Sequence, residues 1–76
     1  NPFGNGTAIR YFIPEMATDA EMIFYDEIGR EIKNVKIEET GNGKMEAKTN
    51  ELAAGIYSYS LVVDGKIVET RKMVRK

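Results

Sequence analysis

Two pairs of adjacent carboxylates, Asp26-Glu27 and Glu38-Glu39, are the side chains of this 76-residue chain best suited to acid–base chemistry. Neighbouring residues on a β-strand point to opposite faces, so neither pair can act together on one substrate atom. The chain has no Cys and no His. Thiolate nucleophiles, a side chain that titrates near neutral pH, and Cys/His zinc sites are therefore excluded. We expect no enzymatic activity and no catalytic, cofactor-binding or metal-binding residues.

Two other motifs have a chemical and a structural interpretation. Gly41-Asn42-Gly43-Lys44 has the composition of a phosphate-binding loop, but it lacks the spacing and the Lys-Ser/Thr ending of one. A hairpin turn explains all of its residues. Tyr57 and Tyr59 could form a stacking platform for bases or sugars. Because the same strand face continues into apolar residues, we expect them to pack in the core, with their hydroxyls bonded at its edge.

Charge is unevenly distributed along the chain. The net charge is only −1, yet the last six residues include Arg71, Lys72, Arg75 and Lys76. This small basic segment does not indicate nucleic-acid binding, because nothing in the sequence suggests an element that reads a groove. Two interpretations stay open: cations that protect an exposed edge strand from unwanted pairing, or a terminal strand that a receptor recognises.

Composition favours an all-β domain. Ile and Val together number 13 and Leu only 2, and β-branched side chains suit a pleated, half-buried surface. No apolar run approaches the roughly 20 residues that a membrane-spanning helix needs, and the sequence shows no signal peptide. Because the chain begins with Asn, we expect it to be part of a longer protein. We expect residues 1–76 to form a single domain with no direct membrane insertion.

Alternating apolar residues predict short strands separated by turns. The expected strands cover about 7–13, 20–25, 30–37, 45–49, 55–63 and 67–74, with a bulge between Ile32 and Val35. No segment has the period of a helix, although residues 50–54 could hold one helical turn. Spacing of this kind predicts an immunoglobulin-like β-sandwich of about seven antiparallel strands. A small barrel is the alternative.

Five residues are predicted to have structural roles in turns and at strand ends. Gly29 and Gly55 provide backbone freedom, and Asp64-Gly65 is a type I′ hairpin signal. Asp26 stands at the start of the first hairpin turn, where its carboxylate can bond to the turn backbone.

An ordered set of motifs spans the chain. It consists of Asn1-Pro2-Phe3, Ile9-Arg10-Tyr11 with Pro14-Glu15, Phe24-Tyr25-Asp26 with Gly29-Arg30-Glu31, Leu52-Ala53-Ala54-Gly55-Ile56-Tyr57, Tyr59, Leu61 and Thr70-Arg71-Lys72-Met73-Val74. In this order and spacing the chain resembles the C-terminal sorting domains (type A) of proteins secreted by the type IX pathway of Bacteroidota.

The resemblance implies a non-catalytic, C-terminal secretion signal with an immunoglobulin-like fold. Its partners would be an upstream cargo domain and the outer-membrane translocon and sortase of the type IX pathway. The cargo would cross the periplasm and reach the outer-membrane surface or the extracellular space, and the sortase would usually remove the domain by cleaving upstream of Asn1. The family's sorting signal lies in the final strand, which corresponds here to Arg71, Lys72, Met73, Val74 and Lys76.

A second context has a similar pattern. The segment from Tyr57 to Lys66 and the Thr70-Arg71-Lys72-Met73 ending also resemble segments that follow the intramolecular chaperone domains of tail-fibre-type proteins. The alternative function is therefore a structural or adhesive β-sandwich, appended to a surface or fibre protein and without a sorting role.

Overall fold

Six β-strands make up the regular structure of the chain. The structure, a computed structural model, describes residues 7–48 and 52–76, and no helix occurs in these two ranges. The strands are β1 (Thr7–Ile13), β2 (Ala20–Tyr25), β3 (Glu31–Lys36), β4 (Gly41–Ala47), β5 (Gly55–Val63) and β6 (Lys66–Arg75). The prediction of about seven strands is thus corrected to six within the described residues.

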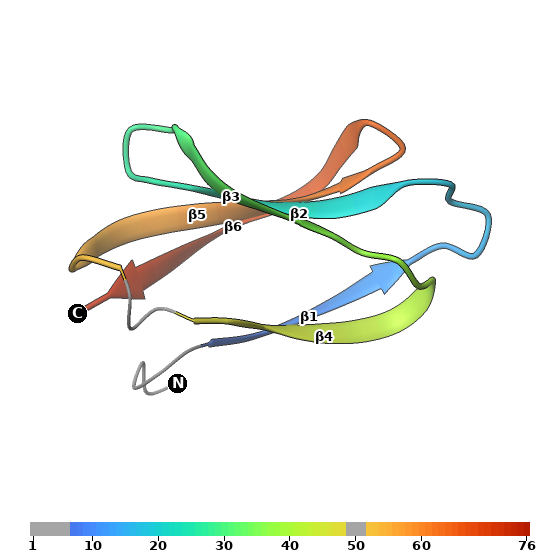
Figure 1. Ribbon diagram of the computed structural model, residues 1–76, viewed down its shortest axis with the longest axis horizontal. Coiled ribbons are helices and arrows are strands. Elements are labelled where there is room, and N and C mark those ends of the chain that lie inside the picture. Colours follow the sequence, from blue (N-terminus) through green and yellow to red (C-terminus); the bar gives the residue numbers. More distant parts are fainter. Residues whose placement is uncertain (1–6, 49–51) are drawn as a thin grey trace.

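The strands form two antiparallel sheets that pack face to face (Figure 1). The larger sheet has the order β3-β2-β5-β6, and the smaller one contains only β1 and β4. Two hairpins, β2–β3 and β5–β6, build the larger sheet and join through β2 and β5. The predicted all-β sandwich is confirmed, with a smaller sheet that covers only part of the larger one.

The core lies between the sheets and follows the predicted alternation. On β2 every second residue is buried, namely Ala20, Met22 and Phe24. The facing sheet contributes Ile9, Ile13 and Ala47, and the β5–β6 hairpin contributes Leu61 and Met73. Since both sheets supply this cluster, each is held in place mainly by burial of its inner face.

The two tyrosines of β5 pack against this core, as predicted. Tyr57 and Tyr59 are half-buried, and the Tyr59 ring lies 5.9 Å from that of Phe24, centroid to centroid. The Tyr57 hydroxyl donates a hydrogen bond of 2.7 Å to the Ala53 carbonyl. The expected bond at the edge of the core is therefore present for Tyr57.

Residues 41–43 correct the prediction of a turn. They are the first residues of β4, and Gly43 lies opposite Tyr11 of β1. A methyl group at Gly43 would come within 2.4 Å of the Tyr11 ring, so the aromatic ring occupies the space that a side chain would need. The glycine serves close packing in a strand. The chain turns earlier, in residues 37–40 between β3 and β4.

The predicted bulge is present in β3. Phe24 pairs with Lys33 and Tyr25 pairs with Glu31, so Ile32 is an extra residue that has no partner in β2. A bulge adds one residue to a strand without ending it. This is why residues 31–36 form one strand despite their broken alternation.

Candidate functional site

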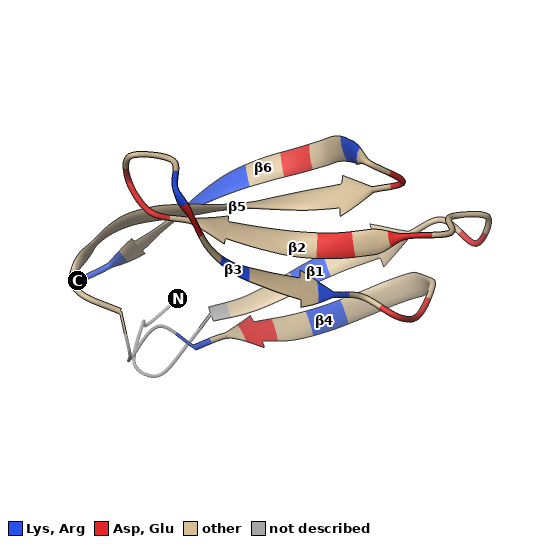
Figure 2. Cartoon of the chain, turned by 45° about the horizontal axis from the view of Figure 1, so that its top comes forward, with Lys and Arg blue, Asp and Glu red and all other residues tan. Residues whose placement is uncertain are grey.

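The predicted sorting segment lies on β6, an edge strand of the larger sheet. In the described part of the chain β6 pairs only with β5, while its other edge carries no neighbouring strand. Figure 2 marks in blue the Lys and Arg positions along this strand. An edge strand presents unpaired backbone N–H and C=O groups to solvent, and these can pair with a strand of another protein.

The five predicted sorting residues divide into exposed and buried groups. Arg71, Lys72 and Val74 lie on β6 and are exposed, and the exposed Lys76 follows the strand directly. Met73 is only 6% exposed and belongs to the core cluster. A partner can therefore contact four of the five side chains on the folded domain, while Met73 fixes the strand to the core.

The two neighbouring cations of β6 have different surroundings. Nε and Nη2 of Arg71 each donate to Oε2 of Glu69 at a distance of 2.6 Å. Lys72 projects from the opposite face, across from Ser58, and has no ion-pair partner within residues 7–48 and 52–76. Lys72 is thus the cation of this pair whose charge is available to a partner.

Exposed apolar side chains also lie on the β5–β6 hairpin, and of these the sequence analysis singled out only Val74. Ile67 and Val68 near its turn are 64% and 61% exposed, and the opposed pair Ile56 and Val74 is close to 40% exposed. For Ile56 and Val74 the signal was present in the sequence, because each directly adjoins a residue of the same strand that packs in the core, Tyr57 or Met73. The edge of the larger sheet is therefore both basic and apolar.

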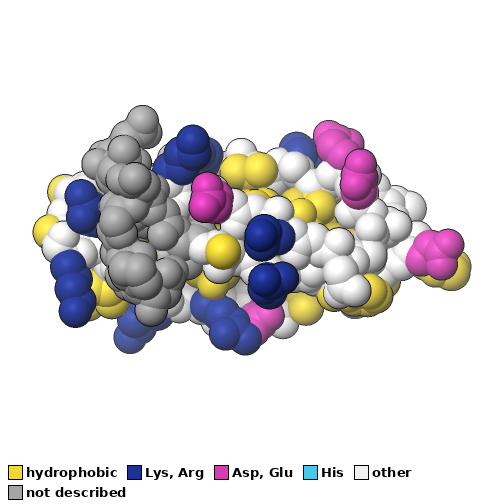
Figure 3. All heavy atoms as spheres, turned by 90° about the horizontal axis from the view of Figure 1, so that it is seen from below, with side chains coloured by type: hydrophobic (Ala, Val, Ile, Leu, Met, Phe, Trp, Pro, Cys, Tyr) yellow, Lys and Arg dark blue, Asp and Glu magenta, His cyan; other side chains and the backbone are white. Residues whose placement is uncertain are grey.

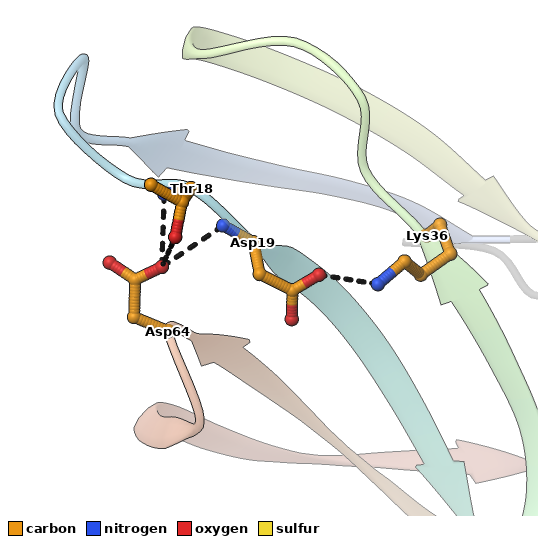
Figure 4. A network of polar contacts seen from close by, with 4 residues as sticks. All are labelled: Thr18, Asp19, Lys36 and Asp64. Carbon is orange, nitrogen blue, oxygen red and sulfur yellow. Dashed lines mark hydrogen bonds and ion pairs between the residues drawn. The ribbon is translucent and has the colours of Figure 1, made fainter.

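Polar side chains stabilise the two hairpin turns, which connect β5 to β6 and β2 to β3. Asp64 and Gly65 join β5 to β6 with φ angles of 50° and 80°, the values of a type I′ turn. Oδ1 of Asp64 accepts hydrogen bonds from the Thr18 N–H and hydroxyl, both at 2.9 Å, and from the Asp19 N–H at 3.0 Å (Figure 4). The turn before β6 is thereby bonded to the connection between β1 and β2.

The same connection is linked to β3. The Asp19 carboxylate forms an ion pair with Lys36 (Figure 4), and this hydrogen bond raises the pKa of the Lys36 ammonium. The bond from the Thr18 N–H, above all, lowers the pKa of Asp64. A short polar chain thus runs from the β6 turn to the opposite edge of the larger sheet.

The β2–β3 turn is organised around Asp26. Its Oδ1 accepts the N–H groups of Ile28 at 3.1 Å and Arg30 at 2.9 Å, and its Oδ2 accepts from Nε of Arg30 at 2.8 Å. The bond from the Arg30 N–H is the main reason why the pKa of Asp26 is lowered. Gly29 has a φ of 90°, and Gly55 is the first residue of β5.

The arrangement suits binding and offers no cluster of ligands for a metal ion. In the described ranges no three carboxylates gather in a way that could hold one, and no helix there is long and apolar enough to cross a membrane. Of the residues that carry the resemblance, those from Ile9 to Glu31 and from Leu52 to Val74 lie within the described ranges. Asn1, Pro2 and Phe3 lie outside them.

The comparisons with known proteins identify a family for the chain. Searches of curated proteins and of solved structures gave no match to the chain. The family model described as "Secretion system C-terminal sorting domain" matches residues 1–76. The chain belongs to this family, the C-terminal sorting domains of the type IX secretion system.

Proposed function

We propose that the chain is a non-catalytic address that takes an upstream cargo through the type IX pathway, with β6 as the part that the machinery recognises. The observation that carries this proposal is the position of β6 at a sheet edge, with Arg71, Lys72 and Val74 exposed beside unpaired backbone groups. Family membership supports the sorting role.

Recognition works by β-augmentation in this proposal. A strand of the translocon pairs with the backbone of β6, and side-chain contacts to Lys72 and Lys76 provide the specificity. The cargo crosses the periplasm and reaches the outer-membrane surface or the medium. The sortase then cleaves upstream of Asn1 and releases the domain.

Substitution tests this proposal better than truncation. Deleting residues 71–76 would remove Met73 from the core and much of the pairing between β5 and β6, so the domain would lose stability whatever its function. Lys72→Glu reverses an exposed charge and leaves the core intact. Lys66→Glu makes the same change at the opposite end of β6, where the side chain is also exposed, and is the matched control.

The experiment fuses residues 1–76 to an exported reporter in a bacterium that has a type IX pathway. We expect the reporter at the cell surface or in the medium, freed of the domain, and we expect Lys72→Glu to retain it in the periplasm while Lys66→Glu does not. A wild-type fusion that stays periplasmic refutes the sorting role. Equal delivery of both variants refutes recognition through the end of β6.

A further inference from the structure

The smaller sheet leaves a groove beside β6. The groove has a volume of about 290 Å³ and lies between β1 and the outer part of the β5–β6 hairpin. Its walls and floor comprise residues 8–11 of β1 together with Met22, Tyr59, Leu61, Glu69 and Arg71. The groove exists because the two sheets differ in strand number: the two strands of the smaller sheet cannot cover the inner face of the four-stranded sheet.

One long wall of this groove is the edge of β1. In the described residues β1 pairs only with β4, so its second edge faces the groove without a strand beside it. β6 forms the other wall, with Glu69 and Arg71 directed toward the smaller sheet, on the same face of the strand as the buried Met73. An extended segment can therefore enter here and pair with β1 as a third strand of the smaller sheet.

The positive charge of the smaller sheet indicates that such a segment carries acidic side chains. Arg10 lies on β1 directly opposite Lys44 of β4, and both side chains are exposed. Figure 3 shows Lys and Arg side chains close together on the outer face of the smaller sheet. Like charges in directly opposed positions destabilise a sheet. Neither cation has an ion-pair partner in the described ranges. The one carboxylate of the groove, Glu69, is already bonded to Arg71.

We propose that this groove binds an acidic, extended segment of the secretion machinery, which adds to the free edge of β1. Side chains on alternate positions of that segment point into the groove, toward Tyr59 and the Glu69–Arg71 pair. The intervening positions lie beside Arg10 and the exposed Phe12. A carboxylate on the segment would complement Arg10, and an apolar side chain two residues away would complement Phe12. This inference rests on the proposed sorting function. It makes the edge of β1 a second recognised edge, in addition to that of β6.

A secretion assay with matched charge reversals tests the proposal. Arg10→Glu places a carboxylate beside the incoming acidic strand, and we expect the delivered fraction of the reporter to fall about tenfold. Arg10→Lys retains the charge and should deliver the reporter normally. Lys33→Glu is the control, because Lys33 is exposed and lines the separate cleft between β3 and β4. Melting temperatures of the purified variants that are no lower than that of the wild type would show that the fold is intact.

The outcomes separate the two proposals. If wild-type protein is delivered and Arg10→Glu is delivered equally well, the groove is not recognised although the sorting function stands. If Arg10→Glu and Lys33→Glu fail to the same degree, net charge explains the loss and the groove proposal is overturned. If the wild-type fusion is not delivered, the sorting function fails and the inference fails with it.

Binding in solution identifies the class of partner. A short synthetic peptide in which Glu alternates with Val is titrated into the isotope-labelled domain, with a peptide of alternating Lys and Val as the control. We expect the acidic peptide alone to shift the amide resonances of residues 8–12, and Arg10→Glu to abolish the shift. No shift with the acidic peptide, or a shift at these amides with anionic lipid vesicles instead, overturns the proposal of a protein strand.

Discussion

Met73 and Val74 are neighbours in the predicted sorting segment, yet their side chains point to opposite faces of β6. Met73 lies in the core, whereas Val74 is 38% exposed and lies on the outer face beside Ile56. The period of two along a strand therefore assigns different physical roles to adjacent residues of one motif. A loss of secretion after substitution has to be compared with a loss of stability before a contact with the machinery is inferred.

Alanine substitution should separate these two roles. Met73→Ala removes a buried side chain and leaves a cavity, so we expect the free energy of unfolding to fall by about 2 to 5 kcal/mol. Val74→Ala, at a partly exposed position, should cost less than about 1 kcal/mol. Urea denaturation followed by circular dichroism measures both values. Similar losses for the two variants would contradict the burial of Met73.

At the scale of the element, β4 shows how a strand can form from residues typical of a turn. Gly41, Asn42 and Gly43 pair with Ile13, Phe12 and Tyr11 of β1, and the Tyr11 side chain lies where a Cβ on Gly43 would be. Packing of an aromatic ring over a glycine compensates for the missing side chain. The neighbouring strand, which is distant in sequence, determines the conformation of this segment.

Gly43→Ala should therefore destabilise the smaller sheet. The added methyl group collides with the Tyr11 ring, and we expect a loss of about 1 to 3 kcal/mol from overpacking. Asn42→Ala, at the exposed neighbouring position, is the control and should change stability by less than about 0.5 kcal/mol. In a Tyr11→Leu background the cost of Gly43→Ala should shrink, because the two residues are in contact. An unchanged cost in the double-mutant cycle would refute this contact.

At the scale of the whole molecule, three ionisable side chains connect stability to pH. The folded pKa of Asp26 and that of Asp64 are lowered from 3.8 by hydrogen bonds that their carboxylates accept from backbone N–H groups, and that of Lys36 is raised from 10.5 by a hydrogen bond to Asp19. A lowered carboxyl pKa stabilises the fold above the unfolded pKa, and this contribution is lost as pH falls through the folded value. A raised Lys pKa stabilises the fold below 10.5, and this contribution is lost as pH rises through the folded value.

The domain should thus have nearly constant stability between about pH 5 and 8, because the chain has no His to titrate there. Its melting temperature should fall below about pH 4 and again above about pH 10.5. Asp64→Asn keeps an acceptor oxygen and tolerates the positive φ, but it cannot ionise, so its melting temperature should depend less steeply on pH in acid. Melting curves from pH 2 to 11 measure this. An equally steep acid dependence in the variant would show that Asp64 is not responsible.

Several features of the molecule follow directly from local patterns in its sequence. Alternating residues such as Ala20, Met22 and Phe24 determine which faces are buried, and Asp64-Gly65 has the residues of a type I′ turn. The order of motifs was sufficient to indicate the family. These features could be predicted because strand periodicity and turn conformation depend on residues close together in the chain.

Other features depend on contacts between distant residues. Only the tertiary structure shows that β6 lies at an edge, that Met73 is buried, that residues 41–43 lie in a strand, and that two strands face four. Strand order is decided by pairing across long stretches of chain, and local alternation is the same for an edge strand and a central one. The sequence by itself determined the strands other than β4 and the alternation of their faces. Packing between them determined which edges are free for recognition.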